Sequence, residues 1–287
     1  MLLQDVLRES IAILHKSGID TPALDAGVII CSVLGKEKAF LYAHGEYAVD
    51  SASLELINNK IQKRAMGIPL QYITGKQEFM SLTFNVNPHV LIPRQDTEIL
   101  VEHVINEIRE KEIHAPYILD IGTGSGCIVL SILHYVNDCR AIAVDISPDA
   151  LRTAYVNSKN LGLSDRVKFY CSDLFDELYK LPEQERKFDI IVSNPPYIPA
   201  SDIEKLDAGV RDFEPILALN GGESGIDFYR KIADQCGKFL KKRGILCVEV
   251  GINQAPIVAE IFSKVLTNIS IIKDYNNIER VVCGEIN

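Results

Sequence analysis

The feature that most constrains the fold of this chain is an alternation of short apolar runs with helical patterns from about residue 93 onward. Runs of this length, bounded by turn residues, are typical of buried strands, and helical stretches separate the first several. The order predicts an α/β fold, with a seven-stranded, mainly parallel, Rossmann-like sheet covered by helices on both faces. The predicted strands are Tyr117–Ile121, Ala141–Val144, Val167–Cys171, Phe188–Val192, Ile245–Val250, Ile269–Lys273 and Arg280–Cys283.

The beginning of the chain has a different pattern. Apolar residues recur there at helical spacing, Thr21-Pro22 provides an N-cap and a first-turn proline, and Gly35 is a natural helix stop. We therefore expect a small all-helical domain over residues 1–75. A hairpin or extended connector is expected over residues 76–92, and the sheet domain over residues 93–287.

Composition and charge exclude several classes of protein. Hydrophobic residues make up 47% of the 287 residues, which is enough for a full core, and no apolar run approaches the roughly 18 residues of a membrane span. No signal peptide is visible at the beginning of the sequence. The net charge of −9 weighs against nucleic acid as the main partner, because proteins that bind duplexes usually carry the opposite sign.

The seven cysteines give no spacing signal for a metal site or a disulfide framework. Their number is odd, no pair is spaced as Cys-x-x-Cys, and most lie inside apolar runs. We expect all seven to be buried small hydrophobes in a reducing cytoplasm, with no metal bound. The histidines show no partner pattern either, and we interpret three of them as structural or solvated: His103, His114 and His134.

A glycine-rich turn follows the first predicted strand of the sheet. The segment Asp120–Gly126 reads Asp-Ile-Gly-Thr-Gly-Ser-Gly and leads directly into a helix. Glycines let the backbone turn tightly and let a ligand approach closely, and a helix N-terminus presents free N–H groups. The spacing is not the Gly-x-Gly-x-x-Gly of dinucleotide-binding proteins. A plain strand–helix turn is the alternative interpretation of this segment alone.

The next two strand ends also carry acids. Asp145 ends the second strand, where a carboxylate can accept both hydroxyls of a ribose, and Asp173-Leu174 follows the third, beside the expected position of a base. Each acid alone could be only a helix cap, but three consecutive strand ends together indicate nucleoside binding. S-adenosylmethionine fits best among nucleoside cofactors, because it has no pyrophosphate and its sulfonium cation suits an acidic pocket.

The fourth predicted strand ends in Asn194-Pro195-Pro196-Tyr197. Both prolines lack an N–H and restrict the residue before them, so the turn presents carbonyl acceptors in a rigid geometry. The amide oxygen of Asn194 and the carbonyl of Pro195 could accept both hydrogens of a planar –NH2 group, with Tyr197 as an aromatic wall. This arrangement suits methyl transfer to an amide or exocyclic amine, driven by orientation. A rigid turn with a core tyrosine is the alternative.

These motifs resemble those of class I S-adenosylmethionine-dependent methyltransferases that act on planar nitrogen. Further segments are similar to the HemK/PrmC proteins, the glutamine N5-methyltransferases of peptide chain release factors. The segments that carry this likeness are Gly67–Gly75, Val90–Glu98, Glu214-Pro215, Ala218-Leu219 and Gly221-Gly222. The sequence departs from the family pattern at Gln95, at Leu174 and at Ser224-Gly225; Leu174 could weaken stacking on adenine.

The resemblance implies methylation of the glutamine in the Gly-Gly-Gln loop of class 1 release factors, with S-adenosylhomocysteine as the product. It implies that Asn194, Pro195 and Tyr197 are catalytic and that Asn194–Tyr197, including Pro196, hold the substrate glutamine. The N-terminal helices would help to hold the release factor. With the residue reasoning above, the expected cofactor-binding residues are Asp120, Gly122, Thr123, Gly124, Ser125, Gly126, Asp145, Asp173, Leu174 and Asn194.

Other interpretations remain open at this point. Glutamine methylation of a ribosomal protein would differ only in substrate docking, and adenine methyltransferases of DNA or RNA share the Asn-Pro-Pro-Tyr motif. A catalytically silent binding module is a third possibility. For Arg94 and Glu98 the alternative to a family role is a surface ion pair at i, i+4. The Lys241–Arg243 run is expected to be a solvated turn before a strand.

Overall fold

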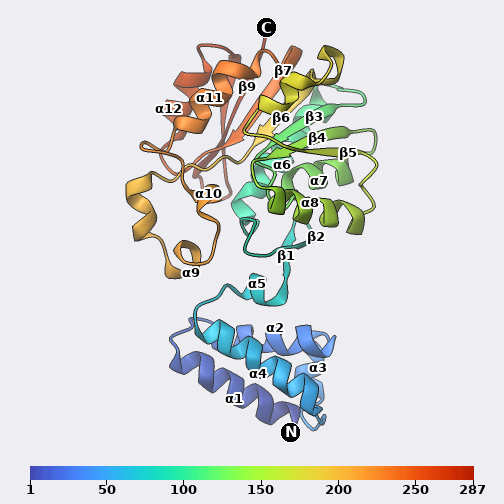
Figure 1. The fold of residues 1–287 in the computed structure, drawn as a ribbon, viewed down its shortest axis with the longest axis vertical. Coiled ribbons are helices and arrows are strands. Elements are labelled where there is room, and N and C mark those ends of the chain that lie inside the picture. The colour runs from blue at the N-terminus through green and yellow to red at the C-terminus, as the bar shows by residue number, and fades with distance from the viewer. The chain divides into compact units, whose positions relative to one another are not determined.

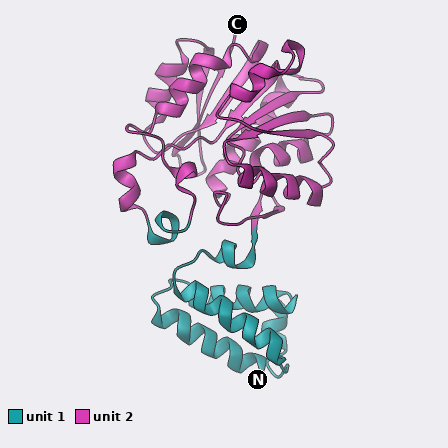
Figure 2. Ribbon diagram, viewed as in Figure 1, with its two compact units in different colours: residues 1–76, 207–213 teal, residues 77–206, 214–287 magenta.

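The computed structural model describes all residues from 1 to 287, and the chain divides into two compact units. The first unit contains residues 1–76 together with 207–213, and the second contains residues 77–206 and 214–287 (Figure 2). The short segment 207–213, which includes helix α9 (Ala208–Arg211), gave no sequence signal for belonging with the helical unit. None of the helices is both long and apolar enough to span a lipid bilayer.

The first unit is a helical bundle. Its helices are α1 (Leu3–Lys16), α2 (Pro22–Leu34), α3 (Lys38–Ala43), α4 (Ser51–Ala65) and α5 (Leu70–Thr74), besides α9. Pro22 occupies the first turn of α2, and Gly35 ends that helix in the left-handed conformation that glycine adopts without strain. The side chain of Asp50 caps α4 by accepting from the backbone N–H of Ser53. Apolar stripes of α1, α2 and α4 form the core of this unit.

A buried ion pair ties two helices of the bundle together. Arg64 Nε on α4 lies 2.7 Å from Asp25 Oδ2 on α2, and the Asp25 side chain is only 4% exposed. Thr21 donates its hydroxyl to the other oxygen of the same carboxylate, and Arg64 donates to the carbonyl of Ile68. Both oxygens of the buried Asp25 carboxylate are therefore hydrogen-bonded, which is the condition under which buried charges are tolerated.

The second unit is built on a seven-stranded sheet in the order β5-β4-β3-β6-β7-β9-β8. Strand β9 is antiparallel to both β7 and β8, and the other neighbours are parallel, so the sheet is mainly parallel as predicted. The strands are β3 (Tyr117–Ile121), β4 (Arg140–Asp145), β5 (Val167–Cys171), β6 (Phe188–Ser193), β7 (Leu240–Glu249), β8 (Thr267–Lys273) and β9 (Glu279–Glu285).

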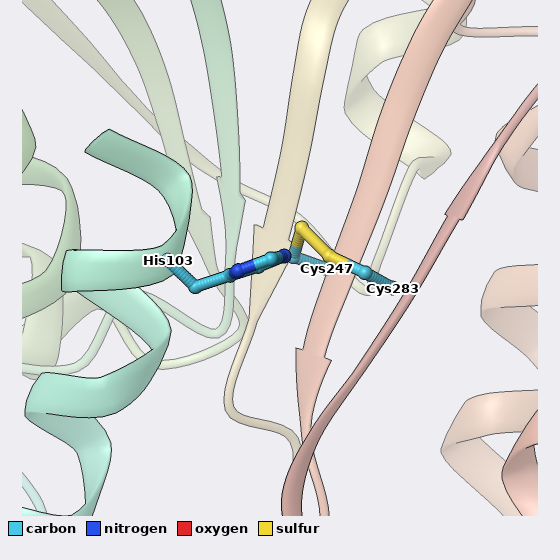
Figure 3. Close-up of side chains that lie close together, drawn as sticks. All are labelled: His103, Cys247 and Cys283. Atoms are coloured by element: carbon cyan, nitrogen blue, oxygen red, sulfur yellow. A yellow bond between two sulfur atoms is a disulfide. The ribbon is translucent and has the colours of Figure 1, made fainter. Parts of the chain in front are cut away.

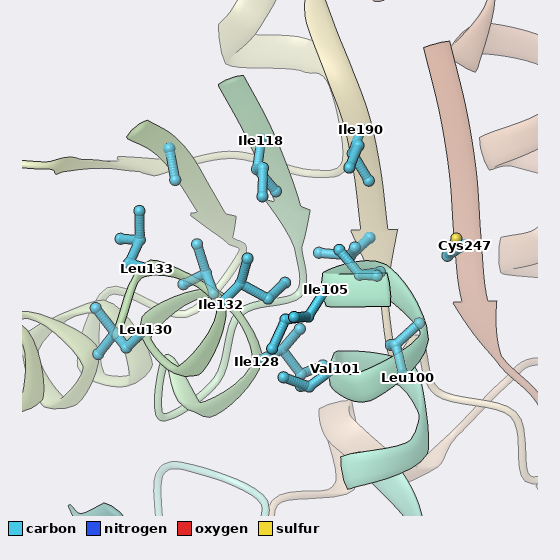
Figure 4. Packing of buried hydrophobic residues seen from close by; sticks show 14 of the residues in the cluster. Leu100, Val101, Ile105, Ile118, Ile128, Leu130, Ile132, Leu133, Ile190 and Cys247 are labelled. Carbon is cyan, nitrogen blue, oxygen red and sulfur yellow. The ribbon is translucent and has the colours of Figure 1, made fainter. Parts of the chain in front are cut away.

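Helices cover both faces of this sheet. Figure 1 shows α6 (Glu98–Glu110), α7 (Cys127–Tyr135) and α8 (Pro148–Asn160) on one face, and α11 (Asp227–Cys236) and α12 (Ala255–Phe262) on the other. Side chains alternate between the faces, because successive strand residues point in opposite directions. Ile118 and Ile190 pack under α6 and α7 (Figure 4), whereas Leu119 and Ile191 pack in the cluster beneath α11 and α12. The remaining helical elements are α10 (Ile216–Leu219) and 3-10 turns at Gln95–Thr97, Asp176–Lys180, Glu183–Glu185 and Ala200–Lys205.

A two-stranded hairpin precedes the sheet. Its strands are β1 (Lys76–Phe79) and β2 (Leu82–Asn85), joined at Met80 and Ser81, which both have positive φ. Two-residue turns with positive φ favour Asn-Gly or Asp-Gly. Because Met80-Ser81 is neither, the sequence gives no signal for a turn at this position. The structure supplies external support instead, because Glu98 accepts from the Met80 N–H and the Tyr135 hydroxyl donates to the Met80 carbonyl.

Two predictions in this unit need correction. The Lys241–Arg243 run is exposed as expected, but it lies within the range of β7 as a bulge, because the pairing with β6 goes from Phe188–Leu240 to Ile190–Ile245 and Arg243 has a φ of 62°. Lys241 pairs there with Asp189. The cysteines are not seven buried small hydrophobes: Cys171 is exposed, and Cys247 and Cys283 form a disulfide. These two residues are 36 positions apart but stand opposite each other in the β7–β9 ladder, so only strand pairing brings them together.

Candidate active site

A cavity of about 380 Å³ opens at the carboxyl ends of the strands in the second unit. This is the edge at which open parallel sheets bind their ligands. Of the predicted site residues, those that line the cavity are Gly122, Thr123, Gly124, Ser125, Asp145, Asp173, Leu174, Asn194, Pro195 and Pro196. Asp120, Gly126 and Tyr197 are not among the lining residues.

The turn after β3 requires glycine at three positions. Gly122, Gly124 and Gly126 have φ values of 71°, 56° and 82°, which side chains other than glycine rarely adopt. A Cβ on Gly126 would also lie 2.9 Å from the Leu130 side chain. The close packing of this residue against helix α7 therefore leaves no room for a side chain. At Gly122 and Gly124 a Cβ would meet no atom within 4 Å, and glycine serves there to set the path of the backbone along the cavity.

Most N–H groups of this turn already have acceptors within the protein. The bonds are Gly122 N to Val144 O (2.9 Å), Thr123 N to Val144 O (3.0 Å), Gly124 N to Asp145 Oδ2 (2.9 Å) and Gly126 N to Thr123 O (2.8 Å). A loop that binds a pyrophosphate needs these donors free for the ligand. The hydrogen bonds of the turn therefore favour a ligand without phosphates, in agreement with the spacing of its glycines.

Asp145 brings a carboxylate to the cavity from the end of β4. Its oxygens accept from the backbone N–H groups of Gly124 and Ser147, both at 2.9 Å, which fixes the plane of the group. Burial raises the pKa of Asp145. Each carboxylate oxygen can accept a second hydrogen bond, so the group retains acceptor capacity toward the cavity.

The corner after β5 places Leu174 in an unusual backbone conformation. Its φ is 47°, and Ser172 supports the turn by donating its hydroxyl to the Leu174 carbonyl and accepting from the N–H of Glu177. Leu174 and Asp173 both line the cavity. The corner thus offers an apolar surface beside a carboxylate.

Asn194 stands at the end of β6 with its amide nitrogen turned into the protein. Its Nδ2 donates to Thr97 Oγ1 at 3.3 Å, and both Asn194 and Thr97 act to lower the pKa of the buried Glu249 carboxyl group. Because an amide has its donors on the nitrogen and its acceptor on the oxygen, this anchoring fixes the orientation of the group. Asn194 lines the cavity together with Pro195 and Pro196.

Comparison with known proteins places both units of the chain. Residues 5–75 match the model of the PrmC N-terminal domain, and residues 115–284 match a model described as a methyltransferase domain. A release factor glutamine methyltransferase of Clostridium acetobutylicum is 41% identical over 98% of this chain and 98% of its own length. A protein of the same name from Moorella thermoacetica is 40% identical over 98% of this chain and 97% of its own.

The chain belongs to the release factor glutamine methyltransferase family. Solved structures support the fold at lower identity. The hMettl16 catalytic domain matches with a TM-score of 0.56 and 16% identity, covering 89% of this chain and 90% of that one. A methyltransferase from Pyrococcus furiosus matches with a TM-score of 0.51 and 16% identity, covering 70% and 87%. The expected methyltransferase fold and family are thereby confirmed.

Asp120 has a different place in this methyltransferase from the one the sequence predicts. Its side chain is fully buried beneath the glycine turn, and Oδ2 accepts the Thr123 hydroxyl at 2.7 Å. Oδ1 is buried without a hydrogen-bond partner. Burial raises the pKa of Asp120 to about 7, and the charge of Asp145 acts in the same direction. Asp120 therefore supports the turn from below rather than lining the cavity.

Tyr197 also differs from its prediction as an aromatic wall of the cavity. Burial raises the pKa of its phenol to about 12. A Cβ on Gly251 would lie 2.9 Å from the Tyr197 ring, and a Cβ on Gly221 would lie 2.7 Å from the Tyr197 Cα. Tyr197 therefore packs closely against both glycines, where a side chain would clash with it. The Tyr197 carbonyl accepts from Gln254 Nε2 at 2.9 Å. In this structure Tyr197 holds the turn in place by packing.

The alternative interpretation of Arg94 and Glu98 as an ion pair on one helix is wrong. Arg94 pairs instead with Glu214, a residue 120 positions away whose side chain is 1% exposed. Glu214 also accepts from the Ile92 N–H, and Arg94 lines the cavity. Arg94 and Glu214 thus join two of the segments that carry the family resemblance, whereas Glu98 supports the hairpin.

Glu249 is the site residue that sequence reasoning missed. It ends β7 next to β6, is 2% exposed, and its Oε2 is buried without a partner. Burial raises the pKa of Glu249 to about 7, against the opposing effects of the Thr97 hydrogen bond and the Arg280 charge. The available signal was a single acid inside the apolar run Ile245–Val250. A charged residue in a buried strand is rare unless it is paired or functional.

Proposed function

We propose that this methyltransferase modifies the side-chain amide nitrogen of the glutamine in the Gly-Gly-Gln loop of class 1 peptide chain release factors. The family supports a release factor as the substrate. The related proteins are named release factor glutamine methyltransferases, and they align with this chain over nearly their whole length. The observation on which the chemistry depends is the fixed amide of Asn194, whose nitrogen is bound by the protein at the wall of the cavity.

S-adenosylmethionine fits the cavity as the cofactor, and when bound it supplies a methyl group on a positively charged sulfur. Most N–H groups of the glycine turn already have acceptors within the protein, so no phosphate is needed to satisfy them. Asp145 has acceptor capacity for ribose hydroxyls, and Leu174 provides an apolar surface for the base. Asp145 and Asp173 give the wall a negative character that suits a cation.

The substrate amide presents a difficulty that the Asn-Pro-Pro-Tyr turn can meet. An amide nitrogen is a poor nucleophile because its lone pair is delocalised into the carbonyl. Asn194 Oδ1 and the Pro195 carbonyl oxygen can each accept one N–H of the glutamine, so that its nitrogen lone pair faces away from both. No residue of this turn needs to act as a base, because the methylated nitrogen is strongly acidic and gives its extra proton to water. Catalysis comes from orientation.

Thr97 and Glu249 act as positioning residues in this proposal. Thr97 accepts from Asn194 Nδ2, and the Glu249 carboxyl group interacts with both residues. A rotated Asn194 amide would present its NH2 group to the substrate, where it would repel the glutamine N–H groups. We further propose that the helical unit takes part in docking the release factor and that the reaction takes place in the cytoplasm. The acidic net charge of −9 supports a protein rather than a nucleic acid substrate.

The test is methylation of purified release factor with labelled S-adenosylmethionine, followed by mass spectrometry of the peptide that contains Gly-Gly-Gln. We expect one methyl group on that glutamine and none on a release factor in which it is replaced by asparagine. Label transferred to the asparagine variant, to a ribosomal protein or to DNA in the same mixture, with none on the glutamine, would overturn the proposal.

A further inference from the structure

Three groups that metal ions prefer lie together on the α6 side of the sheet. His103 comes from α6, Cys247 from β7 and Cys283 from β9, and their ligand atoms all lie within 4.8 Å of one another. Figure 3 shows the imidazole directed at the pair of sulfur atoms. None of the three lines the active-site cavity, so the cluster is separate from the methyltransferase chemistry.

The imidazole nitrogen nearest the cysteines has no hydrogen-bond partner. His103 Nε2 is buried, and the nearest carboxylate oxygen, Glu107 Oε1, is 3.9 Å away, beyond hydrogen-bonding distance. A structural disulfide needs no third polar group beside it. A buried, unpartnered nitrogen in an otherwise well-packed region calls for a specific explanation, and an ion is one of the few available.

We propose that, when Cys247 and Cys283 are reduced, their thiolates and His103 Nε2 bind one Zn²⁺ ion. Two Zn–S bonds of about 2.3 Å at a tetrahedral angle place the sulfur atoms about 3.8 Å apart, and the Zn–N bond is about 2.0–2.1 Å long. The present separations are compatible with these values, because the two Cα atoms are 4.3 Å apart and side-chain rotation separates the sulfurs once they are no longer bonded.

The charges of such a site suit its surroundings. Two thiolates neutralise a divalent cation, so the complex with neutral histidine carries no net charge into the apolar cluster that contains both cysteines. Glu107, one helical turn from His103, lies outside this group of three, and one of its oxygens is held by Lys111 at 3.1 Å. Soft sulfur and imidazole ligands select zinc over magnesium or calcium.

The two states of the cluster exclude each other. A dithiol reductant gives two electrons and two protons to the Cys247–Cys283 bond, which breaks to form two thiols while the reductant becomes its own disulfide. Metal binding then releases the two thiol protons to solvent as both Zn–S bonds form. The oxidised pair has no thiolate to offer and does not bind the metal.

The experiment is an anaerobic titration of the full chain with Co²⁺, which reports tetrahedral sulfur coordination by its visible absorption bands. A Cys171→Ser background removes the exposed thiol. We expect the reduced protein to bind one equivalent of Co²⁺ with these bands, displaced by Zn²⁺, and the oxidised protein to show none. Because both forms have the same sequence, this comparison does not depend on a variant that folds.

Variants then identify the ligands. Cys247→Ser and His103→Gln should lose or strongly weaken the tetrahedral spectrum, whereas Cys236→Ser, a buried cysteine on α11, should retain it. The melting temperature of the reduced protein should rise with the free Zn²⁺ concentration, as expected for a ligand that binds only the folded state. A reduced protein without the visible bands, or bands that persist in Cys247→Ser, would overturn the proposal. Neither result bears on methyl transfer.

Discussion

Replacement of Glu249 by leucine tests whether the active site depends on the anchored amide of Asn194. The substitution removes the buried carboxyl group whose pKa Asn194 and Thr97 lower, and it leaves the space filled. A hydrogen bond to a charged group contributes about 1.5–3 kcal/mol. If that energy holds the Asn194 amide in its productive orientation, its loss lowers the fraction of correctly oriented enzyme about 10- to 100-fold, since about 1.4 kcal/mol corresponds to a factor of ten.

The assay is steady-state methylation of release factor, with kcat and both KM values measured separately. We expect Glu249→Leu to lower kcat about 10- to 100-fold and to leave the KM for S-adenosylmethionine nearly unchanged, because Glu249 does not line the cavity. Glu249→Gln keeps an acceptor oxygen and should restore most of the activity. Glu260→Gln, on the exposed face of α12, is the matched control. Full activity in Glu249→Leu, or equal losses in the leucine and glutamine variants, would refute the reasoning.

Three further predictions concern other parts of the molecule. Asn194→Ala should retain S-adenosylmethionine affinity in calorimetry but lose about 100-fold or more in kcat, because the reacting amide is no longer oriented; unchanged turnover would contradict this. Burial raises the pKa of Asp120 from 3.8 to about 7, so between these pH values the folded wild type holds a proton that the unfolded chain releases, and its stability falls as pH rises. Asp120→Asn removes this proton-linked loss of stability. In urea titrations, the free energy of unfolding of the variant relative to wild type should therefore increase by up to about 4 kcal/mol from pH 4 to pH 8. A difference that does not change with pH would show that the pKa of Asp120 is not raised. Arg64→Met leaves the Asp25 carboxylate buried without its partner and should destabilise the helical unit by about 3 kcal/mol in thermal unfolding. Arg8→Met, which removes an exposed ion pair, is the control, and a smaller loss of stability in Arg64→Met than in Arg8→Met would contradict the prediction.

Several strands of the sheet could be predicted closely because they are short apolar runs between turn signals. The predicted ranges 117–121 and 167–171 agree with β3 and β5, since apolar residues between turn signals leave little choice of boundaries. The start of β7 was missed because Lys241–Arg243 form an exposed bulge, which local patterns cannot separate from a loop. The Met80-Ser81 turn was missed for a related reason, since its support comes from Glu98 and Tyr135 rather than from turn residues.

The candidate site was predictable where function acts through local motifs. The glycine turn, Asp145 and the Asn194–Pro196 segment do lie around one cavity, because parallel strands end at the same edge of the sheet. Residues that act through long-range contacts were not predictable. The link from Glu249 to Asn194 and the Cys247–Cys283 pair both depend on which strands are neighbours, and a single sequence does not specify strand order.

The most direct test of the proposed chemistry is a crystal structure of the protein with S-adenosylhomocysteine and the Gly-Gly-Gln loop of a release factor. We predict that the glutamine Nε2 lies about 2.7–3.2 Å from both Asn194 Oδ1 and the Pro195 carbonyl oxygen, with its free side toward the cofactor sulfur. A glutamine bound elsewhere, or one that meets the NH2 group of Asn194 instead of its oxygen, would contradict the account.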